Sequence, residues 1–512
     1  MTRTSKLLLV PILLLQILLF TFVAQHRFVD GDEGFYLVAS RLVLMHKKPY
    51  LDFFFTQAPL LPYVYALWMK SFGISWISAK LLPALLTALL GTLLYEHVRH
   101  ETRSWIAALS AVVLFAASTL IFAWFPVVKT YSLAGLFLFS AYVVVSRSSA
   151  GPHRGWLGAG GLLLGLSVDT RSSLVLVTPL FLWWIFQNSG ARARVVSILW
   201  FLGGFAIGIV PCLYFFMSSP DAFLFDNLGY YAIRSNAGLV GMWQEKLFVL
   251  LMSFLGGPEG NGIQNSILFF ISLGLVPLIA RREWSPRFAF QIALVLGVIA
   301  LIPTPVHPQY LCFCIPFLLA STICAVNDWF LTLGSRRERL VAVAGCVLLA
   351  AVYLAASVND FRKYLITGEG IPTVRWAHDK DDWRQQRIIE VSQAIDQIAR
   401  PGEIVASFWK GYIFQTQASP FPGLEADSGL PIAGKLTPEQ RARYHILSWE
   451  QIQANFAAHV PRVVVVQNNQ EHKSILVPEV MGDAAKSSLL TNGYTLVRSI
   501  GDTSIYVCCS KP

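Results

Sequence analysis

Three carboxylates stand within four residues near the start of this 512-residue chain. Asp30, Asp32 and Glu33 directly follow a strongly apolar stretch from Leu7 to about Ala24. Carboxylates at a membrane surface are costly unless they contact water, a cation or a substrate, so such a cluster indicates a functional site. One of them could act as a base that takes a proton from a hydroxyl group. Because Asp and Glu also favour the first turn of a helix, capping of a helix over Phe35 to Met45 is the alternative reading.

The segment that carries these carboxylates, about Gln25 to Trp76, is far longer than a connecting turn needs, which is typical of functional loops. Within it, Tyr36 to Met45 and Leu60 to Phe72 have amphipathic patterns, which predict helices that lie flat at a membrane surface. Asp52 and Gln57 add polar groups to the same segment. An acid after a Pro-Tyr pair, as Asp52 is, equally suits a turn.

The composition is that of a polytopic membrane protein, with 55% hydrophobic residues, 14% charged residues and a mean hydropathy of +0.55. Taking roughly 20 residues as the length that crosses a bilayer, we predict about eleven membrane spans. They are Leu7 to Ala24, Ile77 to Leu94, Ile106 to Phe122, Ser132 to Val145, Gly155 to Val168, Ser173 to Phe186, Val195 to Met217, Ile263 to Ile279, Phe288 to Ile302, Tyr310 to Val326 and Leu340 to Ala356.

The apolar character ends near Ser357, which predicts two domains. We expect a transmembrane domain over residues 1–356, with a large first external loop over residues 25–76, and a soluble domain over residues 357–512. In the soluble domain, helices are predicted over Arg384 to Ala399 and Trp449 to His459, and strands over Glu403 to Ser407 and Arg462 to Gln467. A hairpin is predicted over Tyr494 to Ile500 and Ser504 to Cys508. The fold class is therefore a helical membrane protein with a C-terminal α/β domain, whose loops face a substrate or belong to a structural cap.

Basic residues in short loops mark the cytoplasmic side of a membrane protein. Arg3 and Lys6 predict a cytoplasmic N-terminus, and the later basic loops fall on the same side: Arg99 and Arg103, Arg147 and Arg154, Arg192 and Arg194, Arg281 and Arg282, and Arg336, Arg337 and Arg339. This orientation places the acidic run and residues 357–512 outside the cytoplasm. The net charge of +10 is largely accounted for by these loops, so it does not indicate a nucleic-acid partner.

Several motifs together resemble the GT-C glycosyltransferases, and within them the group of protein O-mannosyltransferases, lipid A aminoarabinose transferases and lipid A core galacturonosyltransferases. The motifs are Asp32-Glu33 with Tyr36 after the first span, Pro49-Tyr50 with Asp52, Pro59, the stretch Gly165 to Arg171, and His307-Pro308-Gln309-Tyr310 with Pro316. The resemblance covers roughly the first 350 residues. It implies a bacterial inner membrane and an inverting transfer of a sugar from a polyprenyl-phosphate donor to a lipid, glycan or protein.

The resemblance also implies roles for individual residues. Asp32 would be the base, oriented by Glu33 or Asp30, although the residues alone leave open which aspartate is the base. Arg171, Lys129 and His307 would bind the donor phosphate, unless the first two are membrane anchors and His307 caps a turn. Substrate binding falls to these residues: Tyr36, Asp52, Gln57, Tyr310, Tyr230 and Arg234. The last two lie in an external loop, Ser218 to Lys246, that could equally form an interfacial helix.

Lys129 stands where many relatives have an acidic residue, so a divalent cation is not expected, although the fold class is compatible with one. Ala58-Pro59 also departs from the Lys-Pro pair of the aminoarabinose transferases. Two other functions remain open. A transporter or flippase for a lipid-linked sugar would share the basic and aromatic residues but would need no base. A non-catalytic scaffold would tolerate any change in the first external loop.

Overall fold

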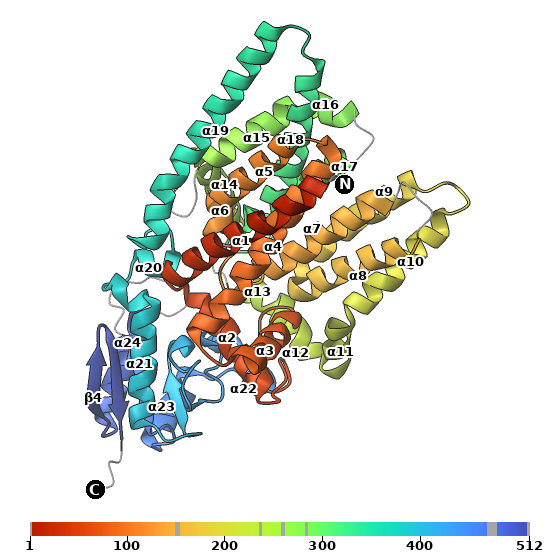
Figure 1. The fold of residues 1–512 in the computed structure, drawn as a ribbon. Helices are drawn as coiled ribbons and strands as arrows, with labels where there is room; N and C mark the ends of the chain where they lie inside the picture. Colours follow the sequence, from red (N-terminus) through yellow and green to blue (C-terminus); the bar gives the residue numbers. More distant parts are fainter. Residues whose placement is uncertain are drawn as a thin grey trace. The chain divides into compact units, whose positions relative to one another are not determined.

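The computed structural model describes residues 3–148, 154–234, 238–257, 262–281, 285–467 and 479–508. They form two compact units, each assembled from segments far apart in the sequence (Figure 1). Unit 1 contains Met1–Ala24, Leu81–Pro211 and Ala237–Ile366, and unit 2 contains Gln25–Lys80, Cys212–Asn236 and Thr367–Pro512. The predicted end of the membrane-spanning region near residue 357 stays a prediction. The compact units divide the chain by contacts instead, and they group the first long loop with the C-terminal residues.

Unit 1 is built from helices, as the apolar stretches predict. The helices that run through it or into it are α1 (Arg3–His26), α4 (Trp76–Thr102), α5 (Trp105–Ala117), α6 (Thr119–Phe122), α7 (Tyr131–Ser148), α8 (Arg154–Thr170), η1 (Ser172–Val177), α9 (Thr178–Asn188), α10 (Arg194–Gly208), α11 (Val210–Ser218), α14 (Gly238–Leu255), α15 (Gly262–Gly274), α16 (Val276–Arg281), α17 (Ser285–Ala300), η3 (Pro308–Phe313), α18 (Cys314–Thr332) and α19 (Arg336–Leu365). Helix α14 forms partly where the sequence predicted an external loop.

Five helical stretches among the described residues are long and apolar enough to cross a membrane: Leu8–His26, Trp76–Thr102, Tyr131–Ser148, Pro308–Thr332 and Arg336–Leu365. Helices α10 and α11 together pass the same test but are bent by 57°, so they form a broken span or a re-entrant loop. Shorter apolar stretches are Trp105–Ala117, Ser172–Asn188, Gly262–Gly274 and Pro286–Ala300. The predicted polytopic fold is confirmed, whereas the number of about eleven crossings stays a prediction.

Helices α8 and α10 pack closely because glycines line their contact. A Cβ atom on Gly204 would lie 1.9 Å from the carbonyl oxygen of Gly158, and a Cβ atom on Gly161 would lie 1.9 Å from that of Phe201. Small residues allow such close approach of helix backbones in membranes. The contact fixes the course of α8, whose last residue directly precedes Arg171.

Unit 2 combines short helices with one mixed sheet. Its helices are α2 (Gly31–Leu44), α3 (Leu60–Phe72), α12 (Pro220–Leu224), the π-helical turn η2 (Phe225–Gly229), α13 (Tyr230–Ile233), α20 (Pro372–Arg375), η4 (Lys380–Trp383), α21 (Gln385–Ile398), η5 (Lys410–Tyr412), η6 (Asp427–Lys435), α22 (Pro438–Arg443), α23 (Trp449–Ala457) and α24 (Glu479–Thr491). The strands are β1 (Ile404–Ser407), β2 (Ser419–Pro420), β3 (Val463–Gln467), β4 (Thr495–Ile500) and β5 (Thr503–Val507), in the order β2-β1-β3-β5-β4.

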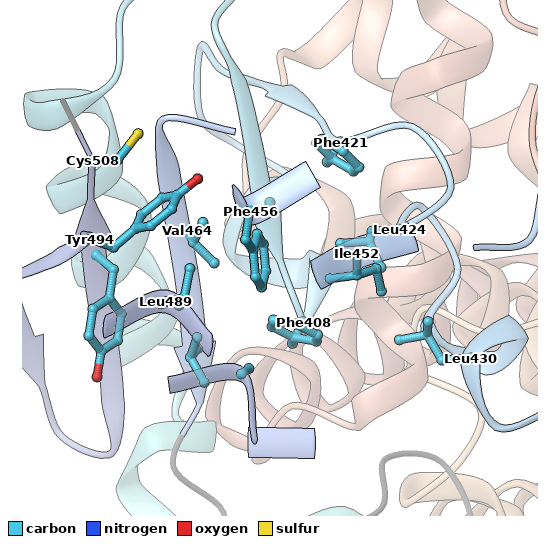
Figure 2. Close-up of a cluster of buried hydrophobic side chains, with 14 residues drawn as sticks. Phe408, Phe421, Leu424, Leu430, Ile452, Phe456, Val464, Leu489, Tyr494 and Cys508 are labelled. Carbon is cyan, nitrogen blue, oxygen red and sulfur yellow. The ribbon is translucent and has the colours of Figure 1, made fainter. Parts of the chain in front are cut away.

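The elements predicted for the C-terminal region are confirmed, with ends shifted by one or two residues. β1 pairs in parallel with β2 and β3, while β5 pairs antiparallel with β3 and β4. Val463 to Val466 of β3 are all buried, as expected of a strand covered on both faces. Figure 2 shows one core, in which Val464 meets Ile452 and Phe456 of α23 and Leu489 of α24.

A second core explains why three distant segments form one unit. Phe54 of the first loop and Tyr230 of α13 pack with Ile432, Leu436 and Ile446 of the C-terminal segment. Buried apolar area of this kind is the main favourable term in folding. The first long loop, residues 25–76, is therefore part of the same folded body as the C-terminal residues.

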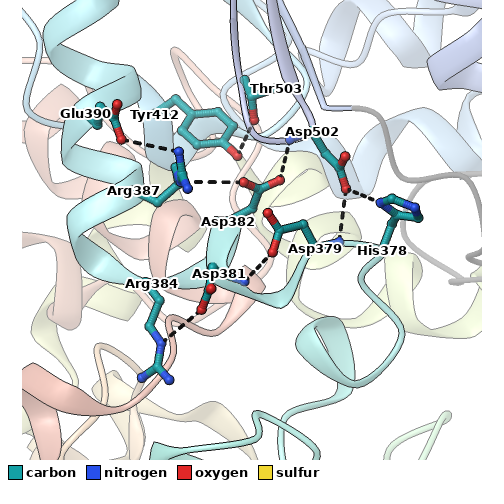
Figure 3. Close-up of polar contacts among 10 residues, drawn as sticks. All are labelled: His378, Asp379, Asp381, Asp382, Arg384, Arg387, Glu390, Tyr412, Asp502 and Thr503. Atoms are coloured by element: carbon teal, nitrogen blue, oxygen red, sulfur yellow. Dashed lines mark hydrogen bonds and ion pairs between the residues drawn. The ribbon is translucent and has the colours of Figure 1, made fainter.

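Polar contacts hold η4 and the residues just before it to the turn of the β4–β5 hairpin (Figure 3). The Oδ2 atom of buried Asp382 accepts the backbone N–H of Asp502 at 2.7 Å, and its Oδ1 atom lies 3.9 Å from Nε of Arg387. The carboxylate of Asp502 accepts the backbone N–H of Asp379 and lies 3.3 Å from Nδ1 of His378. Burial, reinforced by the neighbouring carboxylates, raises the pKa of Asp382 to about 6.

The glycine contact predicts a difference between two neighbouring substitutions. Gly204→Ala should destabilise the protein by about 1–3 kcal/mol, because the new methyl group meets the backbone of α8. Gly203→Ala should have little effect, since no heavy atom lies within 4 Å of the methyl position. Thermal unfolding of both variants in detergent measures the difference. Equal melting temperatures would contradict the close packing.

The environment of Asp382 predicts a pH dependence. Because its pKa is raised from 3.8 to about 6, the folded chain binds this proton more readily than the unfolded chain, and its contribution to stability falls as pH rises between these values. Asp382→Asn should reduce that fall in melting temperature, because the amide oxygen still accepts the Asp502 N–H but does not titrate. Asp381→Asn, at an exposed neighbour, is the control. A pH profile unchanged by Asp382→Asn would refute this assignment.

Candidate active site

The acidic run forms the first turn of α2. Asp30 is the N-cap residue, and its Oδ1 atom accepts the backbone N–H of Asp32 at 3.0 Å. The Oε1 atom of Glu33 accepts the backbone N–H of Asp30 at 2.8 Å, which closes a capping box. The capping alternative is therefore confirmed for Asp30 and Glu33.

Glu33 is also the acid of a buried ion pair. Its Oε1 atom lies 3.7 Å from the Arg27 guanidinium, and both side chains are only 1% exposed. Buried charges persist in proteins when they are paired and hydrogen-bonded, as this one is. Sequence reasoning missed Arg27, although its place three residues before Asp30 at the end of the first span was a usable signal.

Asp32 differs from the other two carboxylates in its surroundings. Asp30 and Glu33 are buried, at 4% and 1% exposure, whereas Asp32 is half-buried at the second position of α2. The N-terminal end of a helix carries partial positive charge, which stabilises an ionised carboxylate there. Of the three acids, Asp32 is thus the one whose side chain is both accessible and held on a rigid element.

Part of the predicted substrate-binding set converges in unit 2. Nε2 of Gln57 donates to the Tyr231 hydroxyl at 2.6 Å, and that hydroxyl donates to the carbonyl oxygen of Thr56 at 2.8 Å. The Arg234 guanidinium lies over the ring of Tyr231 at 4.8 Å and over that of Tyr230 at 5.6 Å. Gln57, Tyr230 and Arg234 therefore belong to one cluster.

Asp226 anchors this cluster and was not among the predicted residues. It is buried in the π-helical turn η2, where its Oδ2 atom accepts the backbone N–H of Phe55 at 3.0 Å. Burial raises its pKa well above the usual range, because the single hydrogen bond only partly offsets the loss of water. Its carboxyl ties the Cys212–Asn236 segment to the first loop. A π-helical turn is a frequent mark of functional sites, but it leaves no clear sequence signal.

Tyr36 and Asp52 have different positions. Tyr36 is buried on α2, one turn after Asp32. Asp52 is exposed, and its Oδ2 atom accepts the backbone N–H of Lys48 at 2.7 Å. That bond is the local turn contact that the alternative reading of Asp52 describes.

Two of the three predicted phosphate-binding residues, Arg171 and His307, meet through Tyr310 in unit 1. Nη1 of Arg171 donates to Oγ1 of Thr130, the neighbour of Lys129, at 3.2 Å. Its guanidinium also lies 5.1 Å from the centre of the Tyr310 ring. The rings of Tyr310 and His307 meet edge to face at 5.6 Å. Two motifs that are well over a hundred residues apart in the sequence thus form one basic and aromatic cluster.

Lys129 lies in a buried, largely non-helical stretch that follows a break between α5 and α6. Its ammonium group sits 5.2 Å from the centre of the Trp124 ring. At the break, Oε1 of Gln264 accepts the backbone N–H of Thr119 at 2.9 Å, and Nε2 of Gln264 donates to the carbonyl oxygen of Ala117 at 2.9 Å. Side-chain hydrogen bonds of this kind replace the helical backbone hydrogen bonds that the break removes, which allows irregular backbone within a membrane.

Helix α19 supports the same stretch from its C-terminal end. The Thr119 hydroxyl lies 2.6 Å from Oδ2 of Asp360, and the Phe122 ring stacks on Phe361 at 4.1 Å. The Trp124 ring meets Tyr364 at 5.9 Å. Packing thus holds the backbone that carries Lys129.

The described residues contain no group of three or more His, Cys, Asp or Glu side chains that could hold a metal ion. That a divalent cation is not expected stays a prediction. Chemically, unit 2 offers an accessible carboxylate on a fixed helix end, and unit 1 offers a cationic cluster suited to an anionic group.

Comparisons with known proteins agree with the predicted resemblance to GT-C glycosyltransferases. Residues 56–215 match the family model described as dolichyl-phosphate-mannose-protein mannosyltransferase. No curated protein was found to match the sequence. Among solved structures, ArnT from Cupriavidus metallidurans bound to undecaprenyl phosphate has a TM-score of 0.66 at 14% identity, covering 100% of this chain and 99% of that chain.

Two further structures show the same fold. The apo state of the same ArnT has a TM-score of 0.66 at 14% identity, covering 98% of each chain. The arabinofuranosyltransferase AftD from Mycobacteria has a TM-score of 0.52 at 16% identity, covering 99% of this chain and 42% of that chain. We conclude that this multi-pass membrane chain has the fold of the ArnT structures, and that its residues 56–215 carry the sequence pattern of the dolichyl-phosphate-mannose-protein mannosyltransferase family.

Proposed function

We propose that the protein is an inverting glycosyltransferase that moves a sugar from a polyprenyl-phosphate donor to a lipid, glycan or protein acceptor. The observation that carries this proposal is the accessible carboxylate of Asp32 on the capped first turn of α2. The match of residues 56–215 to a family that uses a prenyl-phosphate sugar, and the undecaprenyl phosphate bound to ArnT, support the donor class.

Asp32 acts as the general base in this proposal. The acceptor hydroxyl oxygen forms a bond to the anomeric carbon, its proton passes to the Asp32 carboxylate, and the bond from the anomeric carbon to the phosphate oxygen breaks. The electron pair of that bond leaves with the polyprenyl phosphate. Direct displacement inverts the anomeric centre. Asp30 and Glu33 keep the helix end in place rather than exchanging protons.

Arg171, Lys129 and His307 stabilise the negative charge on the leaving phosphate. Charge-assisted hydrogen bonds from an arginine to a phosphate are among the strongest in proteins, and the Thr130 contact orients the Arg171 guanidinium. Tyr310, packed against both Arg171 and His307, closes one side of this cluster. The proposal places a cation here where relatives have an acid.

Sugar or acceptor recognition falls to the Gln57 cluster. Tyrosine faces suit sugar rings, and amide groups suit sugar hydroxyls. Gln57, Tyr230 and Arg234 are already held together by Tyr231. Tyr36 lies on the same helix as Asp32. Asp52 stabilises the local turn after Lys48.

The basic loops favour an orientation with the N-terminus in the cytoplasm and unit 2 on the outer face of the plasma membrane. In a bacterium this face is the periplasmic side of the inner membrane. A polyprenyl-phosphate sugar presents its anomeric carbon at that surface.

A transporter or flippase for a lipid-linked sugar is the second candidate, favoured by the basic and aromatic cluster around Arg171. It differs from a transferase in one respect that can be tested. Movement of a lipid-linked sugar breaks no covalent bond, so it needs no base at Asp32.

The first prediction from this proposal concerns Asp32. Asp32→Asn should lower the rate of sugar transfer by at least about 100-fold, because general base catalysis contributes roughly that much. Lipids that co-purify with the variant should then retain a sugar-loaded polyprenyl phosphate by mass spectrometry, whereas the wild type releases that sugar when envelope lipid is added. Asp483→Asn, at a distant exposed position, is the control. Normal discharge by Asp32→Asn would exclude Asp32 as the base, whereas a sugar-loaded lipid that neither the variant nor the wild type discharges would favour the flippase.

The second prediction concerns the phosphate. Arg171→Met should weaken binding of undecaprenyl phosphate about tenfold or more, because a hydrogen bond to a charged group is worth about 1.5–3 kcal/mol. Arg194→Met, which removes another arginine that lies over an aromatic ring of unit 1, should not. Binding to detergent-solubilised protein provides the measurement. Equal affinities would remove Arg171 from the site.

A further inference from the structure

We propose that Trp409 and Thr373, far along the chain in the C-terminal region, are positioning residues that fix the catalytic carboxylate of Asp32. This inference rests on the proposed function, since it assigns a role relative to the base. It gives the C-terminal residues a part in the reaction beyond that of a structural cap.

Both side chains form hydrogen bonds with the backbone of Gly31, the residue that precedes Asp32. The indole N–H of Trp409 donates to the carbonyl oxygen of Gly31 at 2.9 Å. The backbone N–H of Gly31 donates to Oγ1 of Thr373 at 3.2 Å. Because the carbonyl of Gly31 belongs to the planar peptide group that joins Gly31 to Asp32, the tryptophan sets the plane from which the Asp32 side chain departs.

Gly31 fits this site closely. A Cβ atom at this position would lie 2.7 Å from the Cγ2 atom of Thr373, so only glycine brings the backbone against the threonine without displacing it. One turn away, a Cβ atom on Gly34 would lie 2.7 Å from the backbone nitrogen of Gly411. The first turn of α2 therefore lies directly against the Trp409 to Gly411 loop.

The Trp409 indole is itself held by other rings. It stacks on Trp76 at 6.1 Å and meets Trp383 at 5.0 Å and Tyr412 at 4.7 Å, edge to face. The hydroxyl of Tyr412 is in turn within 2.8 Å of Oγ1 of Thr503 in β5. The N–H that reaches Gly31 therefore projects from a fixed ring and not from a mobile surface side chain.

The approach to Asp30 and the far end of α2 are held in the same way. The backbone N–H of Val29 donates to the carbonyl oxygen of Trp383 at 2.8 Å, and the Arg384 guanidinium lies 3.6 Å from the centre of the Phe28 ring. Arg41, in the last turn of α2, donates to the carbonyl oxygens of Ile413 and Ala418 at 2.7 and 2.6 Å. C-terminal residues thus contact α2 and its approach at several points.

The physical reason for such support is that the reaction tolerates little displacement of its base. A base must sit within hydrogen-bond reach of its proton, and misplacement by about 1 Å can cost 100-fold in rate. A helix end at a membrane surface frays unless its backbone groups are satisfied. Trp409 and Thr373 supply that restraint next to the base, without contacting the reacting atoms.

Three variants test the assignment in the full-length protein. Trp409→Phe keeps an aromatic ring but removes the N–H. Thr373→Val keeps the shape of the side chain but removes the hydroxyl group. Thr373→Ser keeps the hydroxyl oxygen that accepts the Gly31 N–H. We expect the first two to slow discharge of the co-purified polyprenyl-phosphate sugar by about 10- to 100-fold. Thr373→Ser should stay within about threefold of wild type. Trp376→Phe, at an exposed tryptophan of the same unit, is the matched control.

A structural readout accompanies the rate. Hydrogen exchange of the backbone over residues 28–36 should speed up in Trp409→Phe and Thr373→Val, while residues 463–467 of β3 and binding of undecaprenyl phosphate stay unchanged. If Asp32→Asn abolishes discharge but both variants discharge at the wild-type rate, the positioning role is wrong and the proposed function stands. If Asp32→Asn discharges normally, the proposed function itself fails. Faster exchange in β3 as well would mean that the variants only loosen the domain, which also overturns the inference.

Discussion

The buried pair of Arg27 and Glu33 is the interaction on which the candidate site depends. Both side chains are 1% exposed, and breaking such a pair by removing one partner costs about 3–5 kcal/mol. Because Glu33 also closes the capping box with Asp30, the pair selects one arrangement for the end of α1 and the start of α2. The carboxylates of Asp30 and Glu33 both accept backbone hydrogen bonds in this arrangement. Asp32, the third carboxylate, is half-buried whereas the other two are buried.

The same logic of satisfied polar groups operates in unit 1. The chain interrupts a helix between Ala117 and Thr119, and Gln264 takes up the backbone groups that the break releases. An interruption that cost several unsatisfied groups in an apolar setting would not persist. The stretch that carries Lys129 is therefore an irregular segment with its own support, and α19 provides more of it through Asp360.

The sequence predicted the elements better than their grouping. Periodicity located α3, α21, β3 and the β4–β5 hairpin within one or two residues, because those patterns are local. Hydropathy, however, reports contact with lipid and not contact between segments, so it separated the first loop from residues that share its core. It also could not rank Asp30, Asp32 and Glu33. Glu33 is set apart by its pairing with Arg27, and the neighbouring Gly31 is contacted by Thr373 and Trp409, more than 340 residues away. The catalytic role of Asp32 remains a proposal.

Unit 2 holds a charged helix end by contacts from distant parts of the chain. A helix of 14 residues with acids in its first turn is only marginally stable alone, so tertiary contacts must supply its order. Contacts from within the first loop alone would leave the Gly31 peptide groups dependent on water. The Gly31 carbonyl accepts from an indole N–H and the Gly31 N–H donates to a hydroxyl oxygen, which ties the start of α2 to a unit with its own hydrophobic core. The rigidity of the proposed base thus depends on the C-terminal residues of unit 2 as much as on α2 itself.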